Sequence, residues 1–295
     1  MPPTSAEEGL PLSDNLLLSV AFTGYARDVI AFRNQSAKTE EHHFVTLKSL
    51  VGYLGDIPVS SLSFEHIRDW KLSLEKRNLS AITIRGYLIK LRVVLGYLNS
   101  KGYNVLPPEQ IPLPKRIDTV PSVITPEQVQ LLINSTRKAR NKAIISMLYS
   151  TGLRVSELCA LNRIDIQENY FTVIGKGGKS RICFIDKRTR RLLERYLAKR
   201  CDNDPALFIS PLIGARITPG GVQELFKYAR KKAGFDFPVH PHTLRHSFAT
   251  NMMINGIDLY QLSKLMGHSS IQTTSVYLHL NDKHLAEDYK KYHSV

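Results

Sequence analysis

The feature that most constrains this fold is a run of prolines near the middle of the chain. Six of them fall within VLPPEQIPLPKRIDTVPSVITPEQ, residues 105–128, at positions 107, 108, 112, 114, 121 and 126. Proline stiffens the backbone and blocks the continuation of a helix, and this segment shows neither helical nor strand periodicity. We therefore predict a proline-rich linker over residues 107–124, between an N-terminal domain (1–106) and a C-terminal domain (125–295).

The half before the linker has a helical pattern. Apolar residues repeat at three- and four-residue spacing over residues 16–32, 42–54, 64–76 and 81–101, which predicts a small domain of four or five helices. Its basic residues cluster late, and the candidate DNA contacts among them are Lys71, Arg77, Arg85, Lys90 and Arg92. For any single lysine, a solvated helix face remains the simpler interpretation.

The half after the linker is also mainly helical, with one small β-hairpin. Residues 125–128, Thr-Pro-Glu-Gln, supply a helix N-cap, a proline at the first helical position and acidic and amide side chains in the first turn. The pattern predicts strands over 170–175 and 181–186 around a Lys-Gly-Gly-Lys turn. The helices we expect lie at about 126–136, 139–150, 187–200, 219–233, 243–255, 258–266 and 270–280.

The charge of the chain is unevenly placed. Residues 1–118 hold 14 Lys+Arg against 12 Asp+Glu, whereas residues 119–295 hold 26 against 14, so most of the net charge of +14 lies in the second half. Such an excess favours a polyanion partner, most often nucleic acid, over solubility alone. The acidic start lacks a signal-peptide pattern and no apolar run approaches 18 residues, so we expect a cytoplasmic, nucleoid-associated protein.

Two arginines and two histidines stand in short polar contexts. Arg154, in TGLRVSEL, follows a helix break, and its planar guanidinium is suited to bind two phosphate oxygens. A surface ion pair with Glu157 would also explain an arginine at this position. His242 and Arg245, in HPHTLRH, are three apart and share a face at a helix start, where free N–H groups favour phosphate. The neighbouring His240 and His246 raise the alternative of a metal site, but no carboxylate or cysteine at ligand spacing completes it.

A lysine and a tyrosine complete the set. Lys179 lies beside glycines at the hairpin tip and could protonate a departing oxygen, while Lys176 and Arg181 are rivals for contact with backbone phosphate. Tyr277 lies in an amphipathic segment, so it is either a nucleophile or simply a half-buried aromatic residue of a helix. As a nucleophile its phenol, of pKa about 10, must lose a proton, which costs roughly 4 kcal/mol at pH 7 unless cations stabilise the charge.

Together these short motifs, in this order, resemble those of the tyrosine recombinase (phage-integrase-like) family, and most of all those of its short Xer-type members. TGLRVSEL resembles the box of the first catalytic arginine, HTLRH the His-x-x-Arg box, and LMGHSS, with His268, the second-histidine box. Nine residues later Tyr277 falls where the family places its nucleophile. The strong resemblance spans about residues 122–285.

The resemblance implies a specific chemistry and architecture. A core-binding (SAM-like) helical domain and a catalytic domain would form a clamp around duplex DNA carrying short core sites. Tyr277 would form a 3′-phosphotyrosyl link, Lys179 would protonate the 5′-oxygen, Arg154 and Arg245 would hold the phosphate, and His242 and His268 would assist. Neither ATP nor a metal cofactor is needed. Four protomers, alike or paired with a related recombinase, would exchange strands through a four-way junction, and residues after Tyr277 would dock on a neighbour.

Three other functions compete with this one. A DNA-binding protein without catalysis predicts the loss of at least one of the six residues, and none is lost. A type IB topoisomerase shares the chemistry but relaxes DNA as a monomer, and the Xer-like boxes disfavour it. A phosphohydrolase on small substrates fits poorly with the charge of the second half. Both chromosome or plasmid dimer resolution and mobile-element integration stay open as roles.

Overall fold

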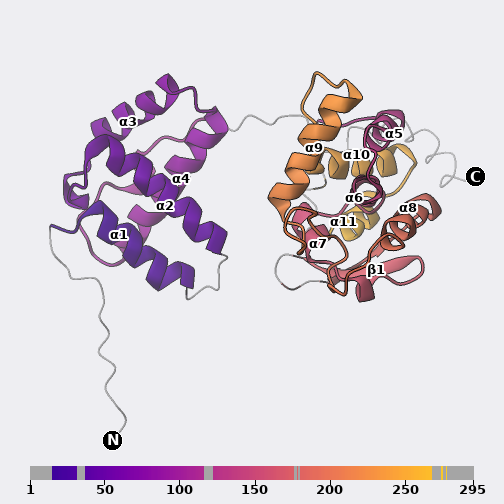
Figure 1. Cartoon of the computed structure of the whole chain (residues 1–295). Coiled ribbons are helices and arrows are strands. Elements are labelled where there is room, and N and C mark those ends of the chain that lie inside the picture. Colours follow the sequence, from indigo (N-terminus) through magenta and orange to yellow (C-terminus); the bar gives the residue numbers. More distant parts are fainter. Residues whose placement is uncertain are drawn as a thin grey trace, which may run out of the picture. The chain divides into compact units, whose positions relative to one another are not determined.

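The fold is described from a computed structural model, which covers residues 15–31, 37–115, 122–175, 178, 180–267, 274 and 277. The chain divides into two compact units, Met1–Asp118 and Thr119–Val295 (Figure 1). Each unit has its own hydrophobic core. None of the described helices combines the length and the apolar character needed to cross a membrane.

The N-terminal unit is built from helices, as the apolar periodicity predicts. They are α1 (Leu18–Tyr25), which continues as a π-helical turn over Ala26–Ala31, α2 (Ala37–Leu54), α3 (Phe64–Lys76) and α4 (Ala81–Ser100). Ser63 and Ser80 cap α3 and α4, each accepting a hydrogen bond from the backbone N–H three residues on. In the core, the fully buried Trp70 stacks on Tyr87 with ring centroids 6.1 Å apart.

The proline-rich segment is shorter as a linker than the sequence predicts. Residues Pro108–Gln110 form a 3₁₀ turn, and Ile111, with no exposed surface, packs into the N-terminal core. At the other end, Ile124 lies in the C-terminal core and its N–H donates to the Ser247 hydroxyl at 2.8 Å. The apolar residues between the prolines explain the difference, because they bury surface that a free linker would leave exposed.

The C-terminal unit surrounds a helix that is buried on nearly every side. Its elements are α5 (Pro126–Asn134), α6 (Ala139–Thr151), α7 (Val155–Ala160), β1 (Tyr170–Ile174), β2 (Ser180–Phe184), α8 (Lys187–Leu197), α9 (Pro219–Ala233), α10 (Pro241–Ile254) and α11 (Leu259–Met266). The central helix is α6, against which α8 and α10 pack. The capping box expected at the start of α5 is present, with Thr125 and Gln128 bonding each other's backbone N–H. Only α7 was not expected.

The predicted hairpin is confirmed as an antiparallel pair in the register Tyr170↔Phe184, Thr172↔Ile182 and Ile174↔Ser180. Its buried face carries Arg181 and Cys183, while the other face leaves Ile182 and Phe184 exposed. Within the turn, Lys176 and Lys179 lie outside the described residues, and so does most of the helix expected over 270–280.

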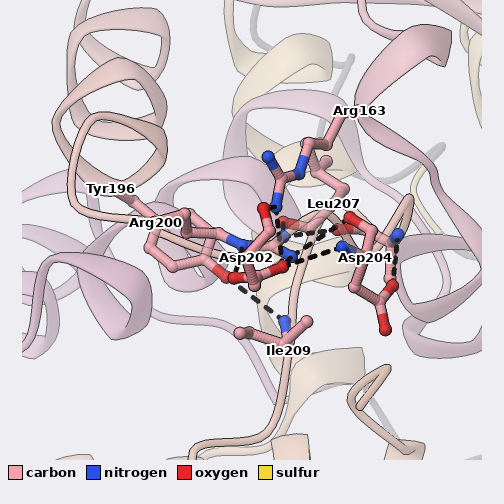
Figure 2. Close-up of polar contacts among 8 residues, drawn as sticks. Arg163, Tyr196, Arg200, Asp202, Asp204, Leu207 and Ile209 are labelled. Atoms are coloured by element: carbon pink, nitrogen blue, oxygen red, sulfur yellow. Dashed lines mark hydrogen bonds and ion pairs between the residues drawn. The ribbon is translucent and has the colours of Figure 1, made fainter. Parts of the chain in front are cut away.

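The loop after α8 is fixed by a polar network centred on Arg200 (Figure 2). Arg200 donates to both carboxylate oxygens of Asp202 and to the carbonyls of residues 204, 206 and 207. Arg163 donates to the Asp202 carboxylate at 2.8 Å, which ties the loop to the segment that follows α7. The Tyr196 hydroxyl accepts from the N–H of Ile209 at 3.2 Å. These bonds fix the backbone of residues 200–209 and join it to Arg163.

Candidate active site

The site begins where α6 ends in a left-handed glycine. Gly152 has φ 62°, and a Cβ there would lie 2.5 Å from Cδ1 of Phe248 in α10. Both facts favour glycine, because a side chain would meet backbone strain and a clash at once. The tight turn allows the chain to begin α7 three residues later, so Arg154 is placed directly at the junction of two helices.

Arg154 occupies the N-cap position of α7 and is held by Glu157 one turn on. Its backbone N–H donates to Glu157 Oε2 at 2.7 Å, and its Nη1 donates to Oε1 at 2.9 Å. Its Nη2 donates to the carbonyl of Gly267 at 3.4 Å. The Arg154 side chain is 30% exposed, so its remaining donors are accessible from outside.

Glu157 is a buried carboxylate shared by two arginines. Both Glu157 and Arg181 are under 10% exposed, and Arg181 bonds the carboxylate through Nη1 at 2.9 Å and Nη2 at 2.7 Å. Burial alone would raise the pKa of Glu157, but the hydrogen bonds from Arg181 and Arg154 lower it to about 2. The pair expected to be a weak surface contact of Arg154 is therefore part of a buried network.

Arg245 in α10 is 5% exposed and lies against two helix ends. It donates through Nη1 to the carbonyl of Gly152 and through Nη2 to that of Met266 at 2.5 Å. Burial, followed by repulsion from Arg154 and Arg181, lowers its pKa to about 10, so it remains a cation at neutral pH. Among the described residues, these two carbonyls are the acceptors of Arg245, whose guanidinium carries five N–H donors.

Three arginines can sit this close because their surroundings are electronegative. Besides the bonds already described, the Nε of Arg181 donates to the carbonyl of Leu265 at 3.0 Å. The acceptors for all three guanidinium groups are thus carbonyls at the C-terminal ends of α6 and α11, together with Glu157. The C-terminal end of a helix carries partial negative charge and carbonyls without intrahelical partners. The fold therefore assembles a cationic site on two helix ends.

Tyr277 lies within this site and is 2% exposed. Its hydroxyl forms a hydrogen bond with Nδ1 of His246, and the two ring centroids are 6.0 Å apart. Burial raises the pKa of Tyr277 to about 12, while the Arg245 cation acts in the opposite direction. The hydroxyl is therefore protonated at neutral pH and within the field of a buried guanidinium.

His242 lies one turn before His246 on α10. Desolvation of the ring, and then repulsion from Arg245 and Arg154, lowers its pKa below the usual value for histidine. A neutral imidazole beside two guanidinium groups can donate one hydrogen bond and accept another. Its position fits a ligand that also contacts both arginines.

Comparison with known proteins decides the family. The model of the phage integrase family matches residues 122–284, which cover more than half of the chain and all of the site. This chain belongs to the phage integrase family. It is a tyrosine-type, site-specific DNA recombinase of the Xer group.

The similarity to individual family members extends along nearly the whole chain. The tyrosine recombinase XerC of Alcanivorax borkumensis is 34% identical over 295 residues, 95% of this chain and 90% of its own. The tyrosine recombinase XerA of Pyrococcus horikoshii is 35% identical over 229 residues, 76% of this chain and 79% of its own. A solved structure of the XerH recombinase bound to a palindromic difH substrate shares the fold at a TM-score of 0.70 and 21% identity, covering 92% of this chain and 85% of that one.

For this recombinase, the structure brings together Arg154, His242, Arg245 and Tyr277 of the predicted catalytic set. Arg154 and Arg245 converge on the end of α11, and Arg245 acts electrostatically on His242 and Tyr277. Lys179 and His268 lie outside the described residues. Lys176, expected to contact DNA, lies outside them as well.

The expectation that Arg181 contacts DNA needs correction. Its side chain is 6% exposed, and all three of its guanidinium nitrogens are bonded, two to Glu157 and one to a carbonyl of α11. Arg181 is therefore an internal partner of Glu157 and not a surface cation. The period-two alternation of β2 places residue 181 on the same side as Cys183, but alternation alone does not show which side is buried.

The candidate DNA contacts of the N-terminal unit lie on α3 and α4 but do not form one row. Arg85 and Arg92 are seven residues apart, two helical turns, whereas Lys90 falls on another side of α4. Lys90 donates to the carbonyl of Gly86 at 3.2 Å, and burial lowers its pKa. Lys71 pairs with Glu75 at 2.7 Å, and Arg77 is an exposed residue at the end of α3.

Two partners of the candidate catalytic residues were not predicted in their observed roles: Glu157 was expected only in a surface pair with Arg154, and the contact of His246 with Tyr277 was not expected. Glu157 was detectable as the acidic N3 residue of a capping box that begins at Arg154. His246 follows His242 by four residues and so shares its helix face, but it was considered only as a metal ligand. Within the described part of the chain, no cluster of three or more His, Cys, Asp or Glu residues could hold a metal ion.

Proposed function

We propose that this recombinase cuts one strand of duplex DNA by attack of Tyr277 on a phosphate held by Arg154 and Arg245. The observation that carries the proposal is the placement of the Tyr277 hydroxyl in the field of Arg245, a buried arginine that shares one helix end with Arg154. Cations fixed before the substrate arrives stabilise charge that develops on the phosphoryl oxygens. Family membership supplies the reaction class, and this geometry supports Tyr277, Arg154 and Arg245 as residues that carry it out.

In the proposed step, the Tyr277 oxygen forms a bond to phosphorus as the bond to the 5′-oxygen breaks. The product is a 3′-phosphotyrosyl link and a 5′-hydroxyl. Arg154 and Arg245 bind the non-bridging oxygens, His242 and His268 assist them, and Lys179 protonates the leaving oxygen. The link conserves the energy of the phosphodiester, so rejoining needs neither ATP nor a metal ion.

The finer architecture of the reaction is also a proposal. The helical N-terminal unit, with its basic α3 and α4, would bind DNA on one side and the catalytic unit on the other, as a clamp over a short core site. Relatives such as XerH and the lambda integrase have been solved with DNA, the latter as a dimer on a core site. We infer a tetramer on two sites, made of this chain alone or paired with a related recombinase, acting through a Holliday junction on DNA in the cytoplasm.

The test is a covalent-complex assay on nicked DNA. A binding site is first selected from random-sequence duplexes with the Tyr277→Phe protein and is then synthesised with a nick that lets the short 5′-hydroxyl fragment diffuse away. The wild-type protein should form a protein–DNA band that survives detergent and EDTA. Tyr277→Phe should bind the same duplex without forming the band.

Two results would count against this function. A covalent band that persists in Tyr277→Phe would exclude this nucleophile. Relaxation of supercoiled plasmid without any recombined product would instead identify a topoisomerase-like activity. Binding to the selected duplex should also weaken by about 0.9 log units per phosphate contact for each tenfold rise in salt.

A further inference from the structure

One side chain in the site has no role in the mechanism above, although it touches the reacting atom. His246 follows Arg245 on α10, and its Nδ1 forms a hydrogen bond with the hydroxyl of Tyr277. The two rings are tilted by 48° with centroids 6.0 Å apart. Tyr277 is 2% exposed, so His246 is in place to receive the phenolic proton without a bridging water.

The chemistry needs an acceptor at this position. With a pKa of about 12, only about one Tyr277 hydroxyl in 10⁵ is ionised at pH 7. Arg245 attracts the phenolate, but burial has the larger effect, so the cation by itself does not produce the nucleophile. A base that takes the proton as the bond to phosphorus forms removes the need for prior ionisation.

The environment of His246 keeps it ready to accept a proton. Burial, followed by repulsion from His242 and Arg245 on the same helix, lowers its pKa below the ordinary value. Among the described residues, the titratable and charged groups that act on the ring are His242, Arg245 and, across the hydrogen bond, Tyr277. At neutral pH the imidazole is uncharged, and the tautomer with hydrogen on Nε2 presents the Nδ1 lone pair to the hydroxyl.

We propose that His246 is a catalytic residue, the general base that takes the proton of Tyr277 during strand cleavage. The inference rests on the proposed role of Tyr277 as nucleophile. As the Tyr277 oxygen bonds to phosphorus, its proton passes to Nδ1 of His246, and the bond to the 5′-oxygen breaks with a proton supplied by Lys179. In the rejoining direction, the 5′-hydroxyl attacks and His246 returns its proton to the departing Tyr277 oxygen.

The experiment compares His246→Asn with the wild type in the covalent-complex assay. The Asn amide oxygen lies near the position of Nδ1 and can accept the hydrogen bond, but it cannot hold the proton. Losing a general base typically costs about 10²–10⁴-fold. We expect His246→Asn to bind the selected duplex like wild type and to cleave it at least 100-fold more slowly at pH 7. His42→Asn, at an exposed site on α2, is the matched control and should keep the wild-type rate.

The pH dependence and the leaving group separate a base from a positioning contact. The wild-type cleavage rate should be flat above neutral pH and fall as His246 is protonated in acid. Without the base, the rate of His246→Asn should rise about tenfold per pH unit between pH 7 and 9, as hydroxide takes the proton. A duplex with sulfur in place of the 5′-bridging oxygen should restore Lys179→Ala, because a thiolate leaves unprotonated, but should not restore His246→Asn.

Each result has one meaning for the proposal. Slow, pH-dependent cleavage by His246→Asn on both duplexes supports it. Cleavage within threefold of wild type, or faster, overturns it and leaves the contact as a resting position of Tyr277. A slow rate that is independent of pH or restored by sulfur also overturns it. These results leave the proposed function intact, whereas a wild-type protein that forms no Tyr277-dependent complex overturns both.

Discussion

Replacing Glu157 with glutamine tests the network that holds Arg154. Glutamine keeps the shape of the side chain but removes the charge that the buried Arg181 requires. Removing one partner of a buried ion pair typically costs about 3–5 kcal/mol. The lowering of the Glu157 pKa from 4.5 to about 2 by these same contacts corresponds to about 3 kcal/mol. For a unit of this size, each kcal/mol shifts the melting temperature by about 2–4 °C, so a loss of about 3 kcal/mol in Glu157→Gln should lower the melting temperature by about 6–12 °C.

The chain contains its own control for this measurement. Its single tryptophan, Trp70, belongs to the N-terminal unit, whereas Glu157 belongs to the catalytic unit. Thermal unfolding followed by far-UV circular dichroism should show the shift, while the transition seen by Trp70 fluorescence should stay in place. Glu168→Gln, at an exposed position of the same unit as Glu157, is the matched substitution and should change neither transition.

The dependence of folding stability on pH in acid provides the result that could refute the stabilising role of the Glu157–Arg181 pair. Because the Glu157 pKa is lowered in the folded protein, its stabilisation is present above about pH 4.5 and is lost as the pH falls toward 2. Wild-type stability should therefore decline through this range more steeply than that of Glu157→Gln. A cost below about 1 kcal/mol, or parallel acid limbs for the two proteins, would show that the pair does not stabilise the site.

Three further changes have definite expected outcomes. Gly152→Ala places a side chain at a positive φ and 2.5 Å from Phe248, so it should destabilise the catalytic unit by about 2–4 kcal/mol, measured by thermal unfolding. Arg245→Lys removes the fork that bonds two helix-end carbonyls and should lower the cleavage rate at least about 10²-fold with DNA binding retained, measured on nicked DNA. Asp202→Asn weakens the hydrogen bonds from Arg200, which are the main cause of the lowered pKa of Asp202. It should lower the melting temperature by a few degrees and leave the cleavage rate of the folded protein unchanged.

The elements of the fold were largely predictable from the sequence because local signals agree with them. Helices α3 and α9 have the predicted bounds, and a threonine cap with proline after it marks the start of α5. The short α7 was missed because six residues give too little periodicity to detect. The linker ends were misplaced because proline content marks extended backbone but does not show that Ile111 and Ile124 find buried positions.

The site was predictable as a set of residues but not as a set of contacts. On β2, Ile182 and Phe184 are more apolar than Arg181, yet they are exposed and the arginine is buried. Hydropathy therefore predicts the wrong face of β2 as the buried one. The burial of Arg181 depends on a carboxylate 24 residues earlier and a helix end 84 residues later. Long-range partners of this kind leave no local pattern. The contact of His246 with Tyr277, 31 residues away, belongs to the same class.

The most direct test of the central claim is to identify the residue that becomes linked to DNA. The covalent complex is digested with nuclease and trypsin, and the peptides are sequenced by mass spectrometry. Cleavage after Lys264 and Lys283 yields the peptide of residues 265–283, in which Tyr277 is the single tyrosine. We expect the nucleotide remnant on Tyr277 of this peptide through a phosphodiester. A remnant on any other residue, or a covalent complex in which this peptide is unmodified, would contradict the account.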